Sequence, residues 1–143
     1  MITKELNIKK YGCFYVSDYH LEMILLPYIK KHIDNSKIII FTEEDLLSTI
    51  RILLDRVNFS EAEKNKILDL HYWNRKKIKE LLDKNEKYIF IINGNISYIE
   101  EMNKKIEKFD LKNYNIVDCY NVEKIDVSEI ENKYDLKLNT SKI

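Results

Sequence analysis

Five polar side chains that follow apolar runs are the residues of this chain best suited to chemistry. They are His20, Glu43, Glu44, His71 and Asn93. Imidazole and carboxylate groups bind transition metals and act as general bases, so these residues could hold one metal ion or remove a proton. Polar residues also collect at strand ends in every α/β protein because loops are solvated, and this simpler interpretation is favoured.

One segment resembles a known metal-binding motif. Val16-Ser17-Asp18-Tyr19-His20-Leu21 looks like the first motif of calcineurin-type metallophosphoesterases, in which an Asp-x-His pair ligates metal, and Asn93-Gly94-Asn95 resembles part of their later Gly-Asn-His motif. However, Ile96 stands where that histidine would be, and a two-metal site needs more ligands than three histidines supply. A phosphoesterase-like, metal-dependent hydrolase that uses Asp18, His20 and His71 is therefore an alternative hypothesis.

The turn after the first apolar run argues against the usual nucleotide sites. A P-loop or a dinucleotide fold needs glycines so that backbone amides can approach the phosphates. The turn Ser17-Asp18-Tyr19-His20 has no glycine, and Asp18 adds a negative charge. Gly94 is interpreted as a turn residue with positive φ. Neither Ser17 nor Cys119 lies in a nucleophile elbow, so we predict no cofactor and assign no catalytic residue.

Several aromatic residues lie at or near the ends of the apolar runs, close to the polar residues just described. Rings with polar tips suit a pocket for an organic ligand or a protein interface, although some of them must belong to the core. They are Tyr15, Tyr19, Tyr72, Trp73, Tyr98 and Tyr120. Together with the polar residues they give a set of predicted ligand-binding residues: Ser17, Asp18, His20, Thr42, Glu43, His71, Trp73, Asn93, Asn95 and Tyr120.

Five short apolar runs, separated by helical patterns, are predicted to be the parallel strands that position these residues. The runs are Cys13 to Val16, Lys37 to Phe41, Ile67 to Leu70, Tyr88 to Ile92 and Tyr114 to Val117. In such sheets ligands bind at the carboxyl ends of the strands. The predicted fold is a single-domain three-layer α/β/α sandwich with a mainly parallel sheet of about five strands and right-handed crossovers.

The polarity of the runs suggests their places in the sheet. The runs at 37–41 and 88–92 are apolar on both faces, which is typical of interior strands covered by helices. The run at 114–117 is flanked or interrupted by Asn115 and Asp118, which favours a place nearer an edge.

Local signals predict where two helices begin. The first should run from about Tyr19 to Ile33, with Asp18 as its cap and a kink or break at Pro27. The other, which is the third helix in the predicted order, should start at Ser60-Glu61-Ala62-Glu63, which matches a capping box.

The composition fits one globular domain. The 143 residues are interpreted as a single α/β domain, 1–143, with 1–10 and 136–143 at its periphery. Twenty-four basic residues balance twenty-four acidic ones, so there is no specific nucleic-acid signal. No signal peptide or membrane span is evident, and we expect a cytoplasmic protein without a membrane partner. Cys13 and Cys119 are expected to be buried, reduced thiols.

The order of elements resembles the MEDS domain, the DcmR-related sensory domain of methanogens and methylotrophs, which looks like a degenerate KaiC/RecA-like core without a P-loop. The likeness rests on Phe14-Tyr15-Val16-Ser17-Asp18, on Leu25-Leu26-Pro27-Tyr28-Ile29 and on the run 38–44 that ends in Thr42-Glu43-Glu44. That domain usually has a histidine before its first strand, where this chain has Tyr11-Gly12. The resemblance implies ligand sensing or signalling without nucleotide hydrolysis.

These observations favour a non-enzymatic sensory or interaction module. It would bind a small-molecule ligand or a protein partner at the C-terminal edge of its sheet. The metal-dependent hydrolase is one alternative, and a purely structural or homo-oligomeric module is another.

Overall fold

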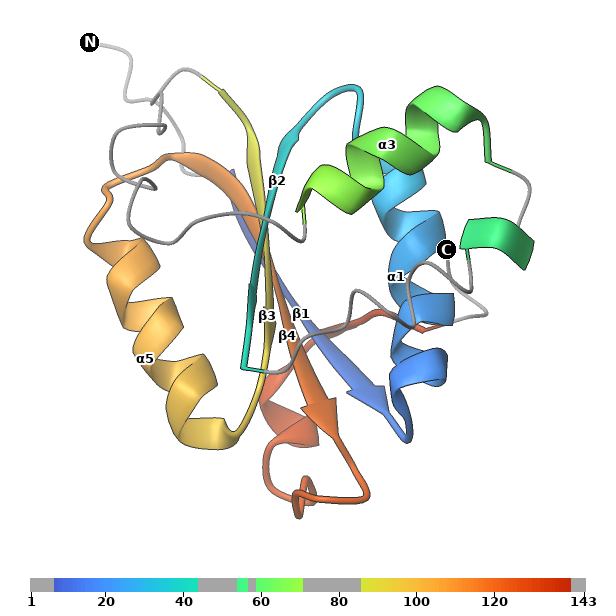
Figure 1. Ribbon diagram of the computed structural model, residues 1–143. Helices are drawn as coiled ribbons and strands as arrows, with labels where there is room; N and C mark the ends of the chain where they lie inside the picture. Colours follow the sequence, from blue (N-terminus) through green and yellow to red (C-terminus); the bar gives the residue numbers. More distant parts are fainter. Residues whose placement is uncertain (1–6, 44–53, 57–58, 71–85, 140–143) are drawn as a thin grey trace, which may run out of the picture.

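A computed structural model describes residues 7–43, 54–56, 59–70 and 86–139 of the chain (Figure 1). Strands and helices alternate along these residues. In chain order they are β1 (Asn7–Tyr15), α1 (Asp18–His32), β2 (Lys37–Thr42), α3 (Glu61–Leu70), β3 (Tyr88–Asn93), α5 (Ile96–Glu107), β4 (Asn113–Asn121), the 3-10 turn η2 (Glu131–Lys133) and β5 (Leu136–Lys137).

The described strands form one five-stranded sheet in the order β2-β3-β4-β1-β5, and every neighbouring pair is parallel. All six residues of β3 are buried, as expected for a strand that is covered on both faces. The α/β fold with a parallel sheet is therefore confirmed.

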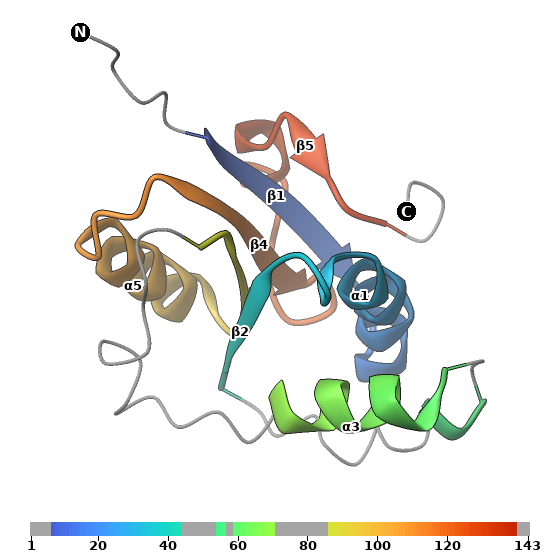
Figure 2. The same cartoon turned by 90° about the horizontal axis from the view of Figure 1, so that it is seen from above.

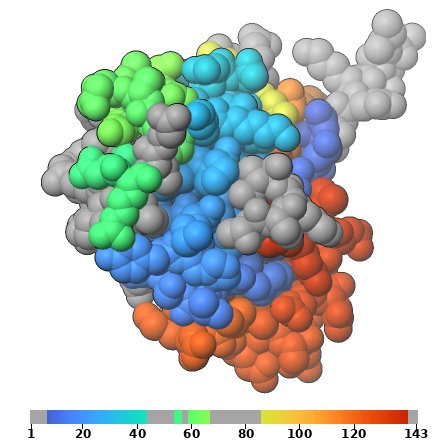
Figure 3. All heavy atoms as spheres, turned by 90° about the vertical axis from the view of Figure 1, so that its right-hand side faces the viewer, coloured from blue at the N-terminus to red at the C-terminus, as the bar shows by residue number. Residues whose placement is uncertain are grey.

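Two apolar clusters pack on the two faces of the sheet and define its layers. Residues of α1, such as Leu21 and Ile24, pack against one face, and residues of α5, such as Ile99 and Ile106, pack against the other. Figure 2 shows α1 and α3 on one side of the sheet and α5 on the opposite side. Seen from the α1 side, α1 (blue) lies at the centre of the surface with α3 (green) beside it (Figure 3).

One predicted strand is wrong. Residues 67–70 form the last turn of α3, not a strand. A run of four residues is too short to separate a strand from a helix by its pattern, and here the helix that starts after Ser60 simply continues through it. The fifth strand is instead β5, a pair of residues near the end of the chain that had no strand pattern.

Two predicted strand positions are also wrong. Among the described strands β2 lies at one end of the sheet, although four of its six residues are buried, and β4 lies in the interior. Burial on both faces depends on the layers above and below, so it does not reveal the order of the strands. The polar residues of β4 are tolerated inside because they have partners: Asn115 Nδ2 donates to the Tyr28 hydroxyl at 3.2 Å.

The first helix differs from its prediction in its cap, and it is not broken at Pro27. Ser17, not Asp18, is the N-cap, because its Oγ accepts the His20 backbone N–H at 3.2 Å. Asp18 lies in the first turn, where its charge favours the positive end of the helix. Pro27 lies inside α1, which is assigned without a break from Asp18 to His32.

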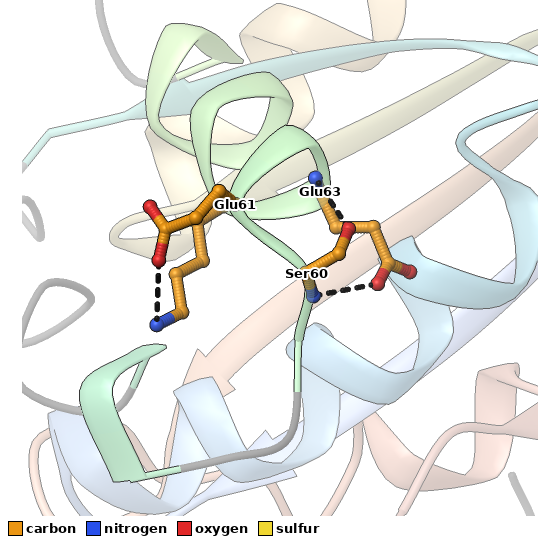
Figure 4. A network of polar contacts seen from close by, with 4 residues as sticks. Ser60, Glu61 and Glu63 are labelled. Carbon is orange, nitrogen blue, oxygen red and sulfur yellow. Dashed lines mark hydrogen bonds and ion pairs between the residues drawn. The ribbon is translucent and has the colours of Figure 1, made fainter.

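The predicted capping box is confirmed at the start of α3 (Figure 4). The Glu63 backbone N–H donates to Ser60 Oγ at 3.1 Å, and the Ser60 N–H donates to Glu63 Oε1 at 2.9 Å. The second of these bonds lowers the pKa of the Glu63 carboxyl. Two backbone donors at the helix start are thus satisfied by side chains.

Replacing Ser60 with alanine should therefore lower the free energy of unfolding by about 1 kcal/mol, since one of these donors loses its acceptor. Urea unfolding followed by circular dichroism would measure the loss. Ser97→Ala is the control, because Ser97 is exposed within α5 and caps no helix. Equal stabilities for Ser60→Ala and the unchanged chain would contradict the capping role.

Candidate functional site

A cavity of about 300 Å³ lies at the carboxyl edge of the sheet. Three of the predicted ligand-binding residues, Glu43, Asn93 and Asn95, line it. The complete lining within the described residues is Tyr15, Glu43, Asn93, Gly94, Asn95, Asn121, Lys124 and Ile125.

The strand register brings these residues together although they are far apart in the sequence. Asn93 of β3 lies between Thr42 of β2 and Cys119 of β4, and Cys119 lies opposite Cys13 of β1. Two residues further along, Tyr15 pairs with Asn121 at the ends of β1 and β4. The cavity thus forms at the edge where β2 and β3 end two residues before β1 and β4.

Asn93 is the central polar residue of this edge and is only 2% exposed. Its Oδ1 accepts the Tyr15 hydroxyl at 2.5 Å, and its Nδ2 donates to Thr42 Oγ1 at 3.3 Å. The side chains of β2, β3 and β1 are therefore linked across β4. This buried chain of hydrogen bonds holds the Tyr15 side chain at the cavity wall.

The Tyr15→Phe substitution should test that link. It removes the hydroxyl and leaves Asn93 Oδ1 buried without this donor, which should cost about 1–3 kcal/mol of unfolding free energy. Tyr11→Phe makes the same change earlier on β1 and serves as the control. Chemical denaturation of both variants would measure the difference, and a Tyr15→Phe chain as stable as the control would argue against the bond.

The glycine at position 94 is explained by the close approach of neighbouring side chains and not by its backbone angle. Its φ is not positive, so the predicted positive-φ turn is wrong. A Cβ at this position would lie 2.4 Å from Glu43 Oε1 and 2.7 Å from Tyr98 Cδ2. A larger residue would therefore have to displace the Glu43 carboxylate, which accepts the Asn95 backbone N–H at 2.6 Å.

The neighbouring strands β1 and β4 send their following segments to opposite faces of the sheet. The chain after β1 forms α1 on one face, while the chain after β4 packs Ile125 and Val127 on the α5 face. In open α/β sheets such a switch point opens a crevice outside the carboxyl ends of the strands, and ligands bind there. The last residues of both strands, Tyr15 and Asn121, line the cavity.

Three other predicted residues belong to the start of α1 and do not line the cavity. Ser17 caps the helix and Asp18 lies in its first turn. His20 Nδ1 accepts the Val16 backbone N–H at 3.0 Å, so this ring nitrogen is already in use. Their polar character serves the helix end.

Tyr120 lies on the α5 face, away from the cavity. Its hydroxyl is 2.7 Å from that of Tyr134, which donates to Asp118 Oδ2 at 2.6 Å. Asn103 Nδ2 donates to the other oxygen, Asp118 Oδ1, at 2.9 Å. Burial raises the pKa of the Asp118 carboxyl, and the bonds from Tyr134 and Asn103 lower it in part. This network fastens the segment after β4 to the sheet.

Thr42 does not line the cavity and instead accepts the hydrogen bond from Asn93. The last two predicted residues, His71 and Trp73, lie outside the described residues, as does Glu44. Within the described residues, no group of three or more His, Cys, Asp or Glu side chains could hold a metal ion. The hydrolase alternative therefore gains no support from the part of the site that the structure describes.

The two cysteines are free and buried, as predicted. They lie side by side on β1 and β4. Burial raises the pKa of the Cys119 thiol well above its usual value, and the adjacent Cys13 thiol raises it further. The Cys119 thiol is thus held in the protonated form beneath the cavity edge.

Glu22 is an acid that the sequence analysis did not single out. It lies on α1, is 1% exposed, and its Oε1 has no hydrogen-bond partner within the described residues. Burial raises its pKa from the ordinary value of 4.5 to about 8, and the charge of Asp18 contributes to the rise. At neutral pH this carboxyl is mostly protonated.

Lys124 and Ile125 are cavity residues that sequence reasoning missed. They follow β4, and Asn121 accepts both of their backbone N–H groups through its carbonyl oxygen at 3.1 and 3.0 Å. No local signal in the sequence marks these two residues, which lie several residues beyond the predicted run at 114–117. Tyr15 and Asn121 had such a signal, since both stand at strand ends.

Comparison of the chain with protein-family models, with curated proteins and with solved structures finds no match. The site is therefore interpreted from its own geometry. Over the residues that the structure describes, no helix is both long and apolar enough to cross a membrane.

Proposed function

We propose that this chain is a non-enzymatic α/β sensory or interaction module that binds a small ligand at the carboxyl edge of its sheet. The observation that supports this best is the cavity at the switch point between β1 and β4, with Glu43, Asn93 and Asn95 in its wall. The resemblance to the MEDS domain agrees with a sensory role and is itself part of the proposal. A protein partner or a second copy of the chain at the same edge remains a prediction.

Hydrogen bonds fix the polar side chains of the cavity wall, and this supports binding. Asn93 is fixed by Tyr15 and Thr42, while Glu43 is fixed by the Asn95 backbone. Polar groups that are held before a ligand arrives lose little conformational entropy when it binds. Such a wall suits recognition of a small polar molecule.

A thermal-shift screen of metabolites, followed by amide chemical-shift mapping on the ¹⁵N-labelled full chain, would test the proposal. A ligand should shift the amides of residues 93–95 and 121–125. The turn at the opposite edge, where residues 33–37 and 86–87 line a second hollow of about 410 Å³, should stay unchanged as an internal control.

Two outcomes would overturn the proposal. Shifts confined to the opposite edge would place binding elsewhere. A chain that binds nothing in the screen and instead self-associates in a concentration-dependent way would support the structural, homo-oligomeric module.

A further inference from the structure

The amide side chains of the cavity wall have a defined orientation. Asn95 Oδ1 accepts the Tyr98 backbone N–H at 2.8 Å, and Asn121 Oδ1 accepts the Glu123 backbone N–H at 2.9 Å. Because a backbone N–H can only donate, the oxygen of each amide must face it, and the Nδ2 groups are left for other partners. Both amides therefore have their Nδ2 donors available to a ligand.

Lys124 adds a positive charge to the same wall. It follows Asn121 in a tight turn, in which the Lys124 N–H donates to the Asn121 carbonyl at 3.1 Å. Donors on a charged and a neutral side chain close together are suited to a carboxylate, because charge-assisted hydrogen bonds are the stronger kind.

Glu43 is the carboxylate of the cavity wall among the described residues. Its Oε1 accepts the Asn95 N–H, and a carboxylate has further lone pairs for a ligand donor. A negative charge here disfavours a phosphate and favours a ligand ammonium group.

The size of the cavity limits the ligand. At about 300 Å³ it lies at the lower end of the range for small-molecule pockets, roughly 300–1,000 Å³. Ile125 supplies an apolar part of the wall. A compact molecule with a short apolar part fits these limits.

We infer that the cavity binds a free amino acid, or a zwitterion of that size, with its carboxylate at Asn121 and Lys124 and its ammonium group at Glu43. This inference rests on the proposed function and names the class of its ligand. Two opposite charges in the wall match the two charges of the ligand, while neither a dianion nor a simple cation would satisfy both.

Isothermal titration of the full chain with each of the twenty common L-amino acids would test the inference. The amino acid that binds most tightly would then be compared with two of its derivatives. The carboxamide lacks the carboxylate, and the N-acetyl derivative lacks the ammonium group. Each derivative should bind at least about tenfold more weakly, as expected when a charged hydrogen-bonding group loses its counterpart.

The Asn121→Asp variant tests the site itself. Aspartate keeps an oxygen for the Glu123 N–H but replaces the Nδ2 donor by a negative charge, so amino-acid affinity should fall at least about tenfold. Asn113→Asp makes the same change at the exposed amino end of β4 and should leave affinity unchanged. If Asn121→Asp fails to fold, the Lys124→Gln variant, which changes an exposed residue, should show the same loss of amino-acid affinity.

Each contrary outcome has a distinct meaning. Derivatives that bind as tightly as the parent amino acid, or an Asn121→Asp chain of unchanged affinity, would overturn the inference. If no amino acid binds but another metabolite shifts the amides of 93–95 and 121–125, the ligand class is wrong and the proposed function stands. If nothing binds at this edge, both fail.

Discussion

Replacing Phe90 with alanine is expected to lower the free energy of unfolding by about 3–5 kcal/mol, the largest loss that we predict for a single substitution. Phe90 lies at the centre of β3 and is completely buried. Its ring stacks with Tyr88 at 5.8 Å and with Phe41 at 6.4 Å, and it meets the edge of Tyr114 at 5.8 Å. Alanine would leave a cavity among three aromatic rings that cannot collapse far, because the strands on both sides hold them.

Urea or guanidinium unfolding would measure this loss. Phe90→Leu should cost clearly less, since leucine fills more of the space. Tyr19→Ala is the control on the surface, where Tyr19 is 46% exposed and a change should stay within about 0.5 kcal/mol. A loss below about 1 kcal/mol for Phe90→Ala would mean that this ring is not in the core.

The Glu22→Gln substitution should change how stability depends on pH. The Glu22 pKa is raised from 4.5 to about 8 in the folded chain, so the folded state holds a proton that the unfolded state has lost. The protonated carboxyl contributes its full stabilisation below about pH 4.5, and this stabilisation is lost as the pH rises to about 8. Between pH 4.5 and 7 the loss amounts to about 3 kcal/mol.

Glutamine cannot ionise, so this loss should be absent in the variant. The difference in unfolding free energy between Glu22→Gln and the unchanged chain should grow with pH, in favour of the variant, and level off above about pH 8. Denaturant titrations at pH 4.5, 6, 7 and 8.5 would measure it, with Glu100→Gln on the exposed side of α5 as the control. A pH-independent difference would show that Glu22 is not buried as a neutral acid.

Four of the five predicted runs fall in strands of the sheet, and the clearest patterns belong to the two that are buried on both faces. Runs such as 38–41 and 89–92 are apolar throughout because both faces are buried, and this pattern is visible without knowing the partners. The run at 67–70 is apolar except for Asp69 and continues a helix, so a short pattern alone misleads. Strand order depends on pairing between distant residues and leaves no local trace.

The same contrast between local sequence patterns and pairing of distant residues explains which site residues could be predicted. Glu43, Asn93 and Asn95 could be predicted because they directly follow strands, and the carboxyl ends of parallel strands meet at one edge. Lys124 and Ile125 enter the cavity only because β4 lies beside β1, which no local pattern reveals. Glu22 could have been noticed, since it shares a helix face with Asp18 and the buried Ile29.

The position of β1 between β4 and β5 has a consequence for how the chain folds. Asn7 pairs with Asn113 and Tyr11 with Leu136, so both neighbours of β1 are synthesised more than 100 residues after it. Closing such long loops costs entropy before any contact is gained, and folds of high contact order form slowly. During synthesis β1 therefore stays without its partner strands until β4 and β5 have emerged, and the cavity beside Tyr15 can form only after β4 is in place.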